Sequence, residues 1–310
     1  MNISLCADEN FVMPALVCLT SIFENNKHEK LKVFLLTDGI SNKSREKFCH
    51  LADIYQQDIV IKIINKDCFR GLTVNERFPI SMYYRFLLPN ILCDEKKVLY
   101  LDCDIIVRHS IKQLYDTDLT GKALAAVVGE SCDDIVFENL LLLKNKYFNS
   151  GVLLINLDYW RRHNITNILI KWVADNPDKC LLPDQNALNK VLDGSVIYVD
   201  YSYNYQEWWF RDSLIHYMHF SKWEDIRKQG KDPVIVHFCE AEKPWFIECK
   251  NPFQNEFLHY AQLHDFVEFK LRKRYGKSYQ CAVFMDRIGL KFRYLSDKWK
   301  RRIVKNIRLN

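Results

Sequence analysis

The stretch Val98-Leu99-Tyr100-Leu101-Asp102-Cys103-Asp104-Ile105-Ile106-Val107 places two carboxylates between two apolar runs. Residues 98–101 form the short apolar run that is typical of a buried strand. Alternation along an extended chain points Asp102 and Asp104 the same way, so both can reach one hard cation through oxygen. Without a cation the two acids would repel each other and raise one pKa, so the pair needs a metal, a basic partner or water. The stretch predicts a metal site or, as the alternative, a solvated turn, and its apolar surroundings favour the metal.

Similar apolar runs alternate with helical patterns along the chain. The predicted strands are Ile3–Ala7, Val33–Leu36, Ile59–Ile64, Val98–Leu101, Ala123–Val128, Val152–Ile155 and Val234–Val236. The predicted helices, in which apolar residues recur every three or four positions, are Phe11–Phe23, Ser44–Tyr55, Tyr83–Leu92, Tyr159–Val173 and Gln185–Leu192. This alternation is typical of an α/β sandwich with a mixed, mainly parallel sheet. Ligands bind at the carboxyl ends of the strands in such sheets, so we looked there for a site.

His237 comes directly after the predicted strand Val234–Val236, as Asp102 comes after its own strand. Neutral imidazole is a good ligand for manganese or zinc. Lys243, a little further along the chain, could meet phosphate oxygens as a point charge. The alternative for His237 is a hydrogen-bonded histidine of the core.

Other polar residues also stand at the ends of predicted elements. They are Asp8, Asn10, Arg85, Asn149, Ser150, Asp184 and Gln185. Each has a plain structural alternative: Asp8 or Asn10 could cap the next helix, and Asp184 could be a helix N-cap. Arg85 could pair with a surface acid. Their shared placement favours a site, and the aromatic stretch Tyr201–Trp223 would suit a wall or lid over it.

The composition excludes several classes of protein. With 48% hydrophobic and 27% charged residues among 310, the chain is globular and not disordered or fibrous. Its nine glycines include no Gly-x-Gly, which excludes the dinucleotide fingerprint and the P-loop. Eleven cysteines without a Cys-x-x-Cys pair favour reduced thiols in a cytoplasm. Because the amino terminus has no basic lead and no apolar run approaches the roughly 18 residues of a span, we expect neither export nor membrane spanning.

The net charge of +5 divides into two parts of opposite sign. Residues 270–310 hold fourteen basic and two acidic side chains, whereas residues 1–269 hold 30 basic and 37 acidic ones. An acidic body with a basic tail predicts an anionic partner for the tail. Apolar residues recur at helical spacing in the tail, at Ile288, Phe292, Leu295, Trp299, Ile303 and Ile307. We expect residues 278–310 to form a helix on an anionic membrane surface, the alternative being a helix docked on the rest of the protein.

Taken in order, seven motifs of the chain resemble glycosyltransferase family 8, and within it the bacterial lipopolysaccharide α-galactosyl- and glucosyltransferases. The motifs are Ala7-Asp8-Glu9-Asn10-Phe11, Tyr83-Tyr84-Arg85, Leu99–Asp104, Asn149–Leu157, Trp160–His163, Pro183-Asp184-Gln185 and His237–Trp245. The likeness extends over residues 1 to about 250, and the tail matches only in its basic, aromatic character. We therefore expect a catalytic domain over residues 1–254 and a helical, basic membrane-docking segment over residues 255–310.

The resemblance implies a GT-A fold and a retaining transfer of galactose or glucose from a UDP-hexose to a glycan or glycolipid. It also implies Mn²⁺ or Mg²⁺ held by Asp102, Asp104 and His237, and a peripheral location on the cytoplasmic side of the membrane. The residues that it places around the donor are Ala7, Asp8, Asn10, Arg85, Asp102, Cys103, Asp104, Asn149, Ser150, Asp184, Gln185, His237 and Lys243. Of these, Gln185, Asp184 and Lys243 are the catalytic candidates, with Lys243 on the diphosphate. Because the amide of Gln185 is a weak nucleophile, we expect front-face attack by the acceptor.

Two positions depart from the family pattern. Glu240 stands where the family usually has a glycine whose amide meets the phosphate, and an acid there is unfavourable unless it turns away. Glu130 follows the predicted strand Ala123–Val128 where a related enzyme carries aspartate.

Two other functions compete with this interpretation. A metal-dependent nucleotidyltransferase or phosphohydrolase could use the same Asp pair, but it would need further carboxylates for a second metal. A non-catalytic carbohydrate- or nucleic-acid-binding protein would explain the basic tail, yet it leaves the ordered motifs before it without a purpose. We therefore expect no nucleic-acid partner.

Overall fold

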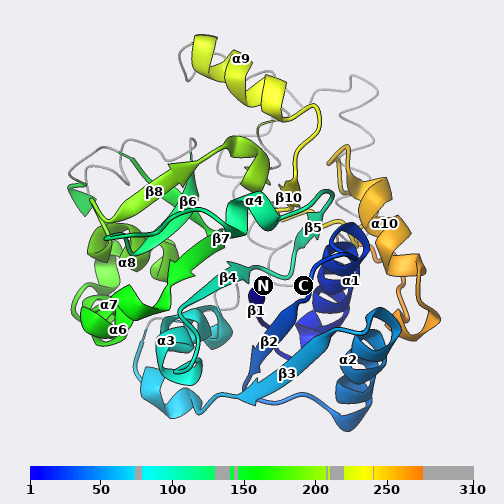
Figure 1. The fold of residues 1–310 in the computed structure, drawn as a ribbon, viewed down its shortest axis with the longest axis horizontal. Coiled ribbons are helices and arrows are strands. Elements are labelled where there is room, and N and C mark those ends of the chain that lie inside the picture. Colours follow the sequence, from blue (N-terminus) through cyan, green and yellow to red (C-terminus); the bar gives the residue numbers. More distant parts are fainter. Residues whose placement is uncertain are drawn as a thin grey trace, which may run out of the picture.

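The computed structural model describes residues 1–72, 74, 79–129, 140–142, 146–206, 209, 220–239 and 241–274. In this part of the chain, helices cover both faces of a seven-stranded sheet, and three further strands form a smaller sheet (Figure 1). The predicted α/β sandwich with a mainly parallel sheet is confirmed.

The large sheet has the strand order β3-β2-β1-β4-β7-β6-β8. Its strands are β1 (Asn2–Cys6), β2 (Lys32–Thr37), β3 (Asp58–Ile63), β4 (Lys97–Leu101), β6 (Leu124–Val128), β7 (Phe148–Asn156) and β8 (Val196–Val199). β7 runs antiparallel to both of its neighbours, and the other pairings in this sheet are parallel. The chain moves outward from β1 to β3 and returns to the other side of β1 with β4. Sheets of this kind bind ligands at such a switch point.

Alternate side chains of the sheet face two separate cores. Leu99 and Leu101 of β4 pack in one core, whereas Val98 and Tyr100 pack in the other. The first core is covered by α1 (Val12–Asn25), α2 (Asn42–Tyr55) and α10 (Gln254–Gln262). The second core is covered by the 3-10 helix η3 (Ile80–Leu87) and by α3 (Leu88–Ile91), α6 (Leu157–Arg162), α7 (Ile165–Asp175) and α8 (Pro183–Val191). Burial of both faces explains why the strands are apolar runs.

Short helices and turns complete the described part of the chain. They are η1 (Glu9–Phe11), η2 (Lys66–Phe69), α4 (Lys112–Tyr115), η4 (Pro177–Lys179), η5 (Tyr201–Asn204), α9 (Phe220–Gln229) and η8 (Asp265–Val267).

Two of the predicted helices are interrupted, each for a local reason. Tyr83–Leu92 is instead η3 followed by the short α3. Pro89 has no N–H for an α-helical bond to the carbonyl of Arg85, which accepts a 3-10 bond instead. Tyr159–Val173 is divided into α6 and α7 at Asn164, whose φ of 52° is left-handed. Asparagine adopts this conformation more readily than most residues.

The smaller sheet brings His237 to the end of β4. It has the order β5-β10-β9, with β5 (Ile105–Val107), β9 (Tyr205–Gln206) and β10 (Ile235–His237). Antiparallel pairing sets His237 opposite Ile105, the residue after Asp104. The backbone N–H of Phe238 also donates to the carbonyl of Asp104 at 2.9 Å. A distant part of the sequence is thereby fixed beside the carboxylate pair.

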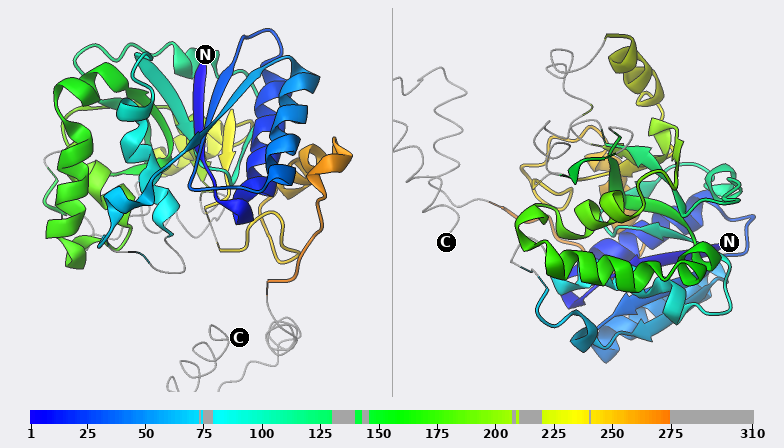
Figure 2. Two further views of the ribbon diagram at one scale, coloured as in Figure 1. Left: turned by 90° about the horizontal axis from the view of Figure 1, so that it is seen from below. Right: turned by 90° about the vertical axis from the view of Figure 1, so that its left-hand side faces the viewer.

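α10 and η8 are the last helices in the described part of the chain. Phe257 of α10 and Val267 of η8 are buried in the core that α1 also lines, and α10 lies beside α1 in both Figure 1 and Figure 2. Residues 275–310 of the predicted membrane-docking segment 255–310, including its predicted helix over residues 278–310, lie outside the described residues, so membrane docking stays a prediction. None of the described helices combines the length and apolar character that crossing a bilayer requires.

Candidate active site

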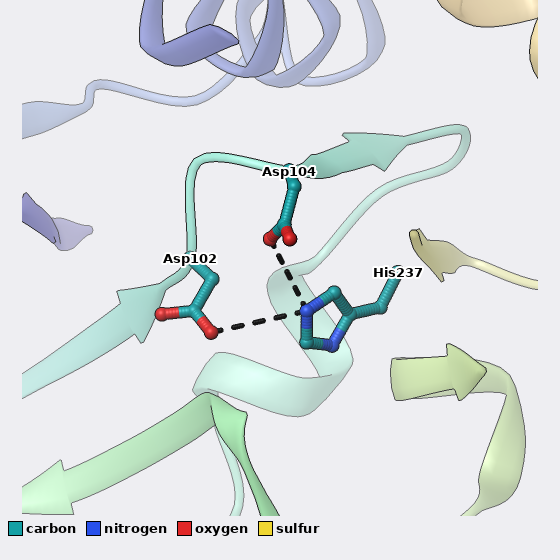
Figure 3. Close-up of side chains that lie close together, drawn as sticks. All are labelled: Asp102, Asp104 and His237. Carbon is teal, nitrogen blue, oxygen red and sulfur yellow. Dashed lines mark ion pairs between the residues drawn. The ribbon is translucent and has the colours of Figure 1, made fainter. Parts of the chain in front are cut away.

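Asp102, Asp104 and His237 converge at the edge of the large sheet where β1 and β4 end (Figure 3). Nε2 of His237 lies 3.2 Å from Oδ1 of Asp104 and 3.8 Å from Oδ2 of Asp102. One ligand atom from each residue lies within 4.8 Å of the other two. The two carboxylates flank a turn between β4 and β5 and do not share one extended strand, yet both face the imidazole. Two carboxylates and an imidazole in this arrangement suit one divalent cation such as Mn²⁺.

Asp102 is held in place by two residues behind it. Its Oδ1 accepts hydrogen bonds from the Tyr100 hydroxyl at 2.7 Å and from Nη2 of Arg85 at 3.0 Å. The Arg85 guanidinium also lies over the Tyr100 ring, 4.3 Å from its centroid. These contacts leave Oδ2 of Asp102 on the side of His237. Arg85 is therefore a buried partner within the site, and the alternative that it pairs with a surface acid is wrong.

Lys243 lies next to the second oxygen of Asp104. Its Nζ is 2.6 Å from Oδ2 of Asp104 and donates to the carbonyl of Phe238 at 2.6 Å. Burial would raise the pKa of Asp104, but the charges of Lys243 and His237 outweigh it and hold that pKa well below its usual range. Burial would lower the pKa of Lys243, but Asp104 outweighs it and raises that pKa. At neutral pH both members of the pair are thus ionised.

His237 is only 3% exposed and stands among charged groups. Burial would lower the pKa of His237, but interactions with Cys239 and Asp104 outweigh it and raise that pKa well above its ordinary value. A cation at Nε2 has to displace a proton from the ring. Cation binding to these three ligands is therefore expected to release protons.

Gly151, in the first half of β7, has no side chain, and the ring of His237 occupies the space that a side chain would fill. A Cβ at this position would overlap Cε1 of His237, and it would lie 2.7 Å from Nδ1 of His237 and 2.9 Å from Oδ2 of Asp102. The backbone here is fixed, because the Gly151 carbonyl accepts from the N–H of Asp102 at 2.8 Å. The missing side chain thus gives the imidazole of His237 room beside the carboxylate of Asp102.

Arg85 also joins the metal-ligand candidates to a third carboxylate, Asp184. Nη1 of Arg85 lies 3.3 Å from Oδ2 of Asp184 and donates to the carbonyl of Ser150 at 2.7 Å. The Ser150 hydroxyl donates to the same Asp184 oxygen at 3.1 Å. Burial raises the pKa of Asp184 more than Arg85 lowers it, so that pKa lies above its ordinary value. Asp184 is the second residue of α8, and the alternative that it is the N-cap of that helix is wrong.

Gln185 uses both ends of its amide in the same cluster. Its Oε1 accepts from the backbone N–H of Ser150 at 2.9 Å and from Nδ2 of Asn149 at 3.2 Å. Its Nε2 donates to the Tyr147 hydroxyl at 3.1 Å. Because β7 is antiparallel, its first residues lie at the same edge of the sheet as the last residues of β4. The structure therefore gathers Asn149, Ser150 and Gln185 beside the carboxylates.

The end of β1 lies at the same edge, and its residues make local contacts. Ala7 is buried. Oδ1 of Asp8 accepts from the N–H of Asn10 at 2.9 Å and from that of Phe11 at 3.1 Å. Asp8 thus caps η1, as one of the alternatives predicted, and any contact of these residues with a ligand stays a prediction.

Cys103 lies between the two carboxylates in sequence, but its side chain is buried. Its thiol donates to the carbonyl of Cys6 at 3.3 Å, so a contact of Cys103 with a ligand also stays a prediction. Glu130 and Glu240, which depart from the family pattern, lie outside the described residues.

Two contributors to the site are not among the residues that the sequence singles out. Asn204 is fully buried, lies 3.0 Å from Nδ1 of His237 and donates to Oδ1 of Asn149 at 2.9 Å. Nothing in its aromatic surroundings marks it in the sequence. Tyr100 carries a usable signal, because it precedes Asp102 by two positions at the end of a strand and so shares its side.

The fold is similar to that of the galactosyltransferase LgtC, whose crystal structure was solved in complex with donor and acceptor sugar analogs. The TM-score is 0.76 at 28% sequence identity, and the match covers 84% of this chain and 95% of that chain. The sheet order and the carboxylate and histidine site at its edge, together with this similarity, define the protein as a GT-A glycosyltransferase.

The chain belongs to glycosyl transferase family 8, whose family model matches residues 2–249. General stress protein A of Bacillus subtilis (strain 168) is 28% identical over 270 residues, which cover 84% of this chain and 92% of that protein. The lipopolysaccharide 1,3-galactosyltransferase of Salmonella typhimurium is 28% identical over 311 residues, with 93% and 91% covered. The family and the fold that the motifs predict are confirmed.

Proposed function

We propose that the protein is a retaining, divalent-metal-dependent hexosyltransferase that moves galactose or glucose from a UDP-sugar to a glycan or glycolipid. The observation that carries the proposal is the convergence of Asp102, Asp104 and His237, with Lys243 beside them, at the switch point of the sheet. The hexose is supported by two of the similar proteins, which are galactosyltransferases. Enzymes of the GT-A class use a nucleotide-sugar donor and a divalent metal, and the two carboxylates and the imidazole of this site are suitable ligands for such a metal.

The charges of the site suit a diphosphate when a cation is bound. Without a cation, Asp102, Asp104 and Asp184 face the positive charges of Arg85, Lys243 and protonated His237. These charges balance, so the residues alone do not attract a dianion. Mn²⁺ or Mg²⁺ would act as a Lewis acid that neutralises the charge of the departing UDP. Asp102, Asp104 and His237 would hold the ion, and Lys243 would place a second positive charge near the phosphates.

The geometry of Gln185 supports attack by the acceptor from the face that the leaving group vacates. Retention needs either such front-face attack or a covalent intermediate on the protein. The amide oxygen of Gln185 already accepts bonds from Ser150 and Asn149, which makes a weak nucleophile weaker. In our proposal the departing phosphate takes the acceptor proton, while Gln185 and Asp184 stabilise the positive charge that develops on the sugar.

For the acceptor we propose a bacterial cell-surface glycan or glycolipid. The support comes from the Salmonella typhimurium relative, which is a lipopolysaccharide galactosyltransferase. The basic tail with its apolar stripe would hold the enzyme peripherally at the inner face of the cytoplasmic membrane, where such an acceptor is made.

A UDP-release assay tests the donor and the metal together. With Mn²⁺, we expect the purified protein to release UDP from UDP-Gal or UDP-Glc in preference to UDP-GlcNAc and UDP-GlcA. Because the cation neutralises the leaving diphosphate, EDTA should abolish release and added Mn²⁺ should restore it. Activity that persists in EDTA would contradict the metal dependence, and preference for the other two donors would contradict the hexose. Protein incubated with donor alone should keep its intact mass, because a glycosyl adduct would overturn front-face attack.

Removal of residues 278–310 should abolish binding to anionic vesicles. Each basic residue near such a surface contributes about 1 kcal/mol, and the apolar stripe adds burial in the headgroup layer. Flotation with vesicles that contain 30% phosphatidylglycerol measures the loss. Full-length protein with Trp299→Glu, which puts a charge on the stripe, should lose binding in the same way. Equal flotation of the intact and the shortened chain would dismiss the anchor.

A further inference from the structure

The side-chain amide of Asn204 connects the two halves of the site. Asn204 ends η5 and comes directly before β9, which pairs in parallel with β10, the strand of His237. One end of the amide lies 3.0 Å from Nδ1 of His237 and the other lies 2.9 Å from Oδ1 of Asn149. Asn149 in turn donates to Gln185. A continuous line of hydrogen bonds thus runs from His237 to Gln185 through fully or partly buried side chains.

The orientation of the amides in this line follows from backbone donors. The N–H of Gly151 can only donate, and it lies 2.9 Å from Oδ1 of Asn149, which must therefore be an oxygen. The atom of Asn204 that faces the same oxygen must be its NH₂ group, so Oδ1 of Asn204 faces His237. The N–H of Ser150 fixes the oxygen of Gln185 in the same way. An oxygen at Nδ1 of His237 requires that this nitrogen carries a proton.

A proton on Nδ1 decides what the other ring nitrogen can do. The neutral ring then presents a lone pair at Nε2, the atom that lies 3.2 Å from Asp104. The opposite tautomer would point an N–H at the cation and remove the third ligand. We propose that Asn204 is a positioning residue that fixes the tautomer and ring plane of His237, and thereby sets the cation affinity of the site. The inference rests on the proposed function, because it requires that the site binds a divalent cation.

The experiment compares three proteins by EPR titration with Mn²⁺. Asn204→Leu removes the acceptor, and we expect it to raise the Kd for Mn²⁺ by roughly ten- to a hundredfold, as loss of a partner behind a metal ligand does. Asn204→Asp keeps an oxygen for Nδ1–H but loses the donor to Oδ1 of Asn149. Its Kd should therefore rise less than that of Asn204→Leu and stay within about fivefold of the wild type. If Asn204 served packing alone, the order would be reversed, because a buried carboxylate disturbs an apolar interior more than leucine does.

A matched control is Asn26→Leu, because Asn26 is also buried and also bonded at both ends of its amide, to Ile22 and Ile111. This variant should keep the Mn²⁺ affinity of the wild type. In a His237→Ala background, Asn204→Leu should have no further effect, because its influence passes through the imidazole.

The outcomes separate the two proposals. Failure of the wild type to bind Mn²⁺ would overturn the proposed function, and the inference with it. Normal binding by the wild type and by Asn204→Leu would overturn the inference alone. If Asn204→Leu does not fold, Asn204→Asp decides, and a Kd raised tenfold or more in that variant would also overturn it.

Discussion

An Asp104→Asn variant should lose metal-dependent transfer, with kcat/KM lowered by roughly 10³-fold. Oδ1 of Asp104 faces Nε2 of His237 at 3.2 Å, and its Oδ2 pairs with Lys243 at 2.6 Å. Asparagine has the same size but lacks the negative charge on which the cation and the lysine both depend. A divalent cation that acts as a Lewis acid stabilises a leaving diphosphate in the transition state by several kcal/mol. Loss of this stabilisation corresponds to the roughly 10³-fold decrease in kcat/KM. UDP-release kinetics and EPR titration with Mn²⁺ measure the two losses, which should run in parallel.

Asp175→Asn is the matched control for this prediction. Asp175 makes an exposed ion pair with Lys171 on α7, and such pairs contribute at most about 1 kcal/mol to stability. Circular dichroism should show that this variant and Asp104→Asn both fold. Asp102→Asn should show the same loss of activity, since it supplies the second carboxylate. Full Mn²⁺-dependent transfer by Asp104→Asn would rule out Asp104 as a metal ligand.

The sheet was predictable because its central strands are buried on both faces. In β4 the alternate side chains enter different cores, so the whole run Val98–Leu101 is apolar and visible in the sequence. β8 is also a short apolar run and could have been found by the same pattern, whereas β9 has only two residues and forms no pattern that stands out. The interrupted helices show a second limit, because apolar spacing continues through Pro89 and Asn164 although the backbone geometry changes there.

The site was predictable to the extent that strand ends reveal it. Asp102 and His237 each stand at the end of an apolar run. The large sheet places Asp102 at the carboxyl end of β4, whereas His237 reaches it through the antiparallel pairing of β10 with β5 in the smaller sheet. The contacts between the site residues were not predictable, because Asn204 and His237 are brought together only by the pairing of β9 with β10. Hydrogen bonds between segments so far apart in sequence leave no local signal.

A Gly151→Ala variant should be nearly inactive although one methyl group is its whole change. The new Cβ would overlap the ring of His237 and lie 2.9 Å from Oδ2 of Asp102. The strand cannot yield easily, because Gly151 is paired through its carbonyl to Asp102 at 2.8 Å. The imidazole must therefore move, and it leaves both the acceptor at Asn204 and the position facing Asp104. We expect a loss of Mn²⁺ affinity and of kcat/KM of about 10²-fold or more, together with about 1–3 kcal/mol of stability from overpacking.

Gly129→Ala is the matched control, because it also replaces a glycine by alanine but causes no steric clash. Gly129 follows β6 in the same sheet, and a Cβ there would meet its nearest atom, the backbone nitrogen of Asn149, at an ordinary 3.5 Å. This variant should keep Mn²⁺ affinity within about threefold of the wild type, because nothing has to move. EPR titration and thermal unfolding of both variants provide the comparison. Wild-type Mn²⁺ affinity in Gly151→Ala would mean that His237 can leave its place without cost, so the cation would depend on the two carboxylates alone.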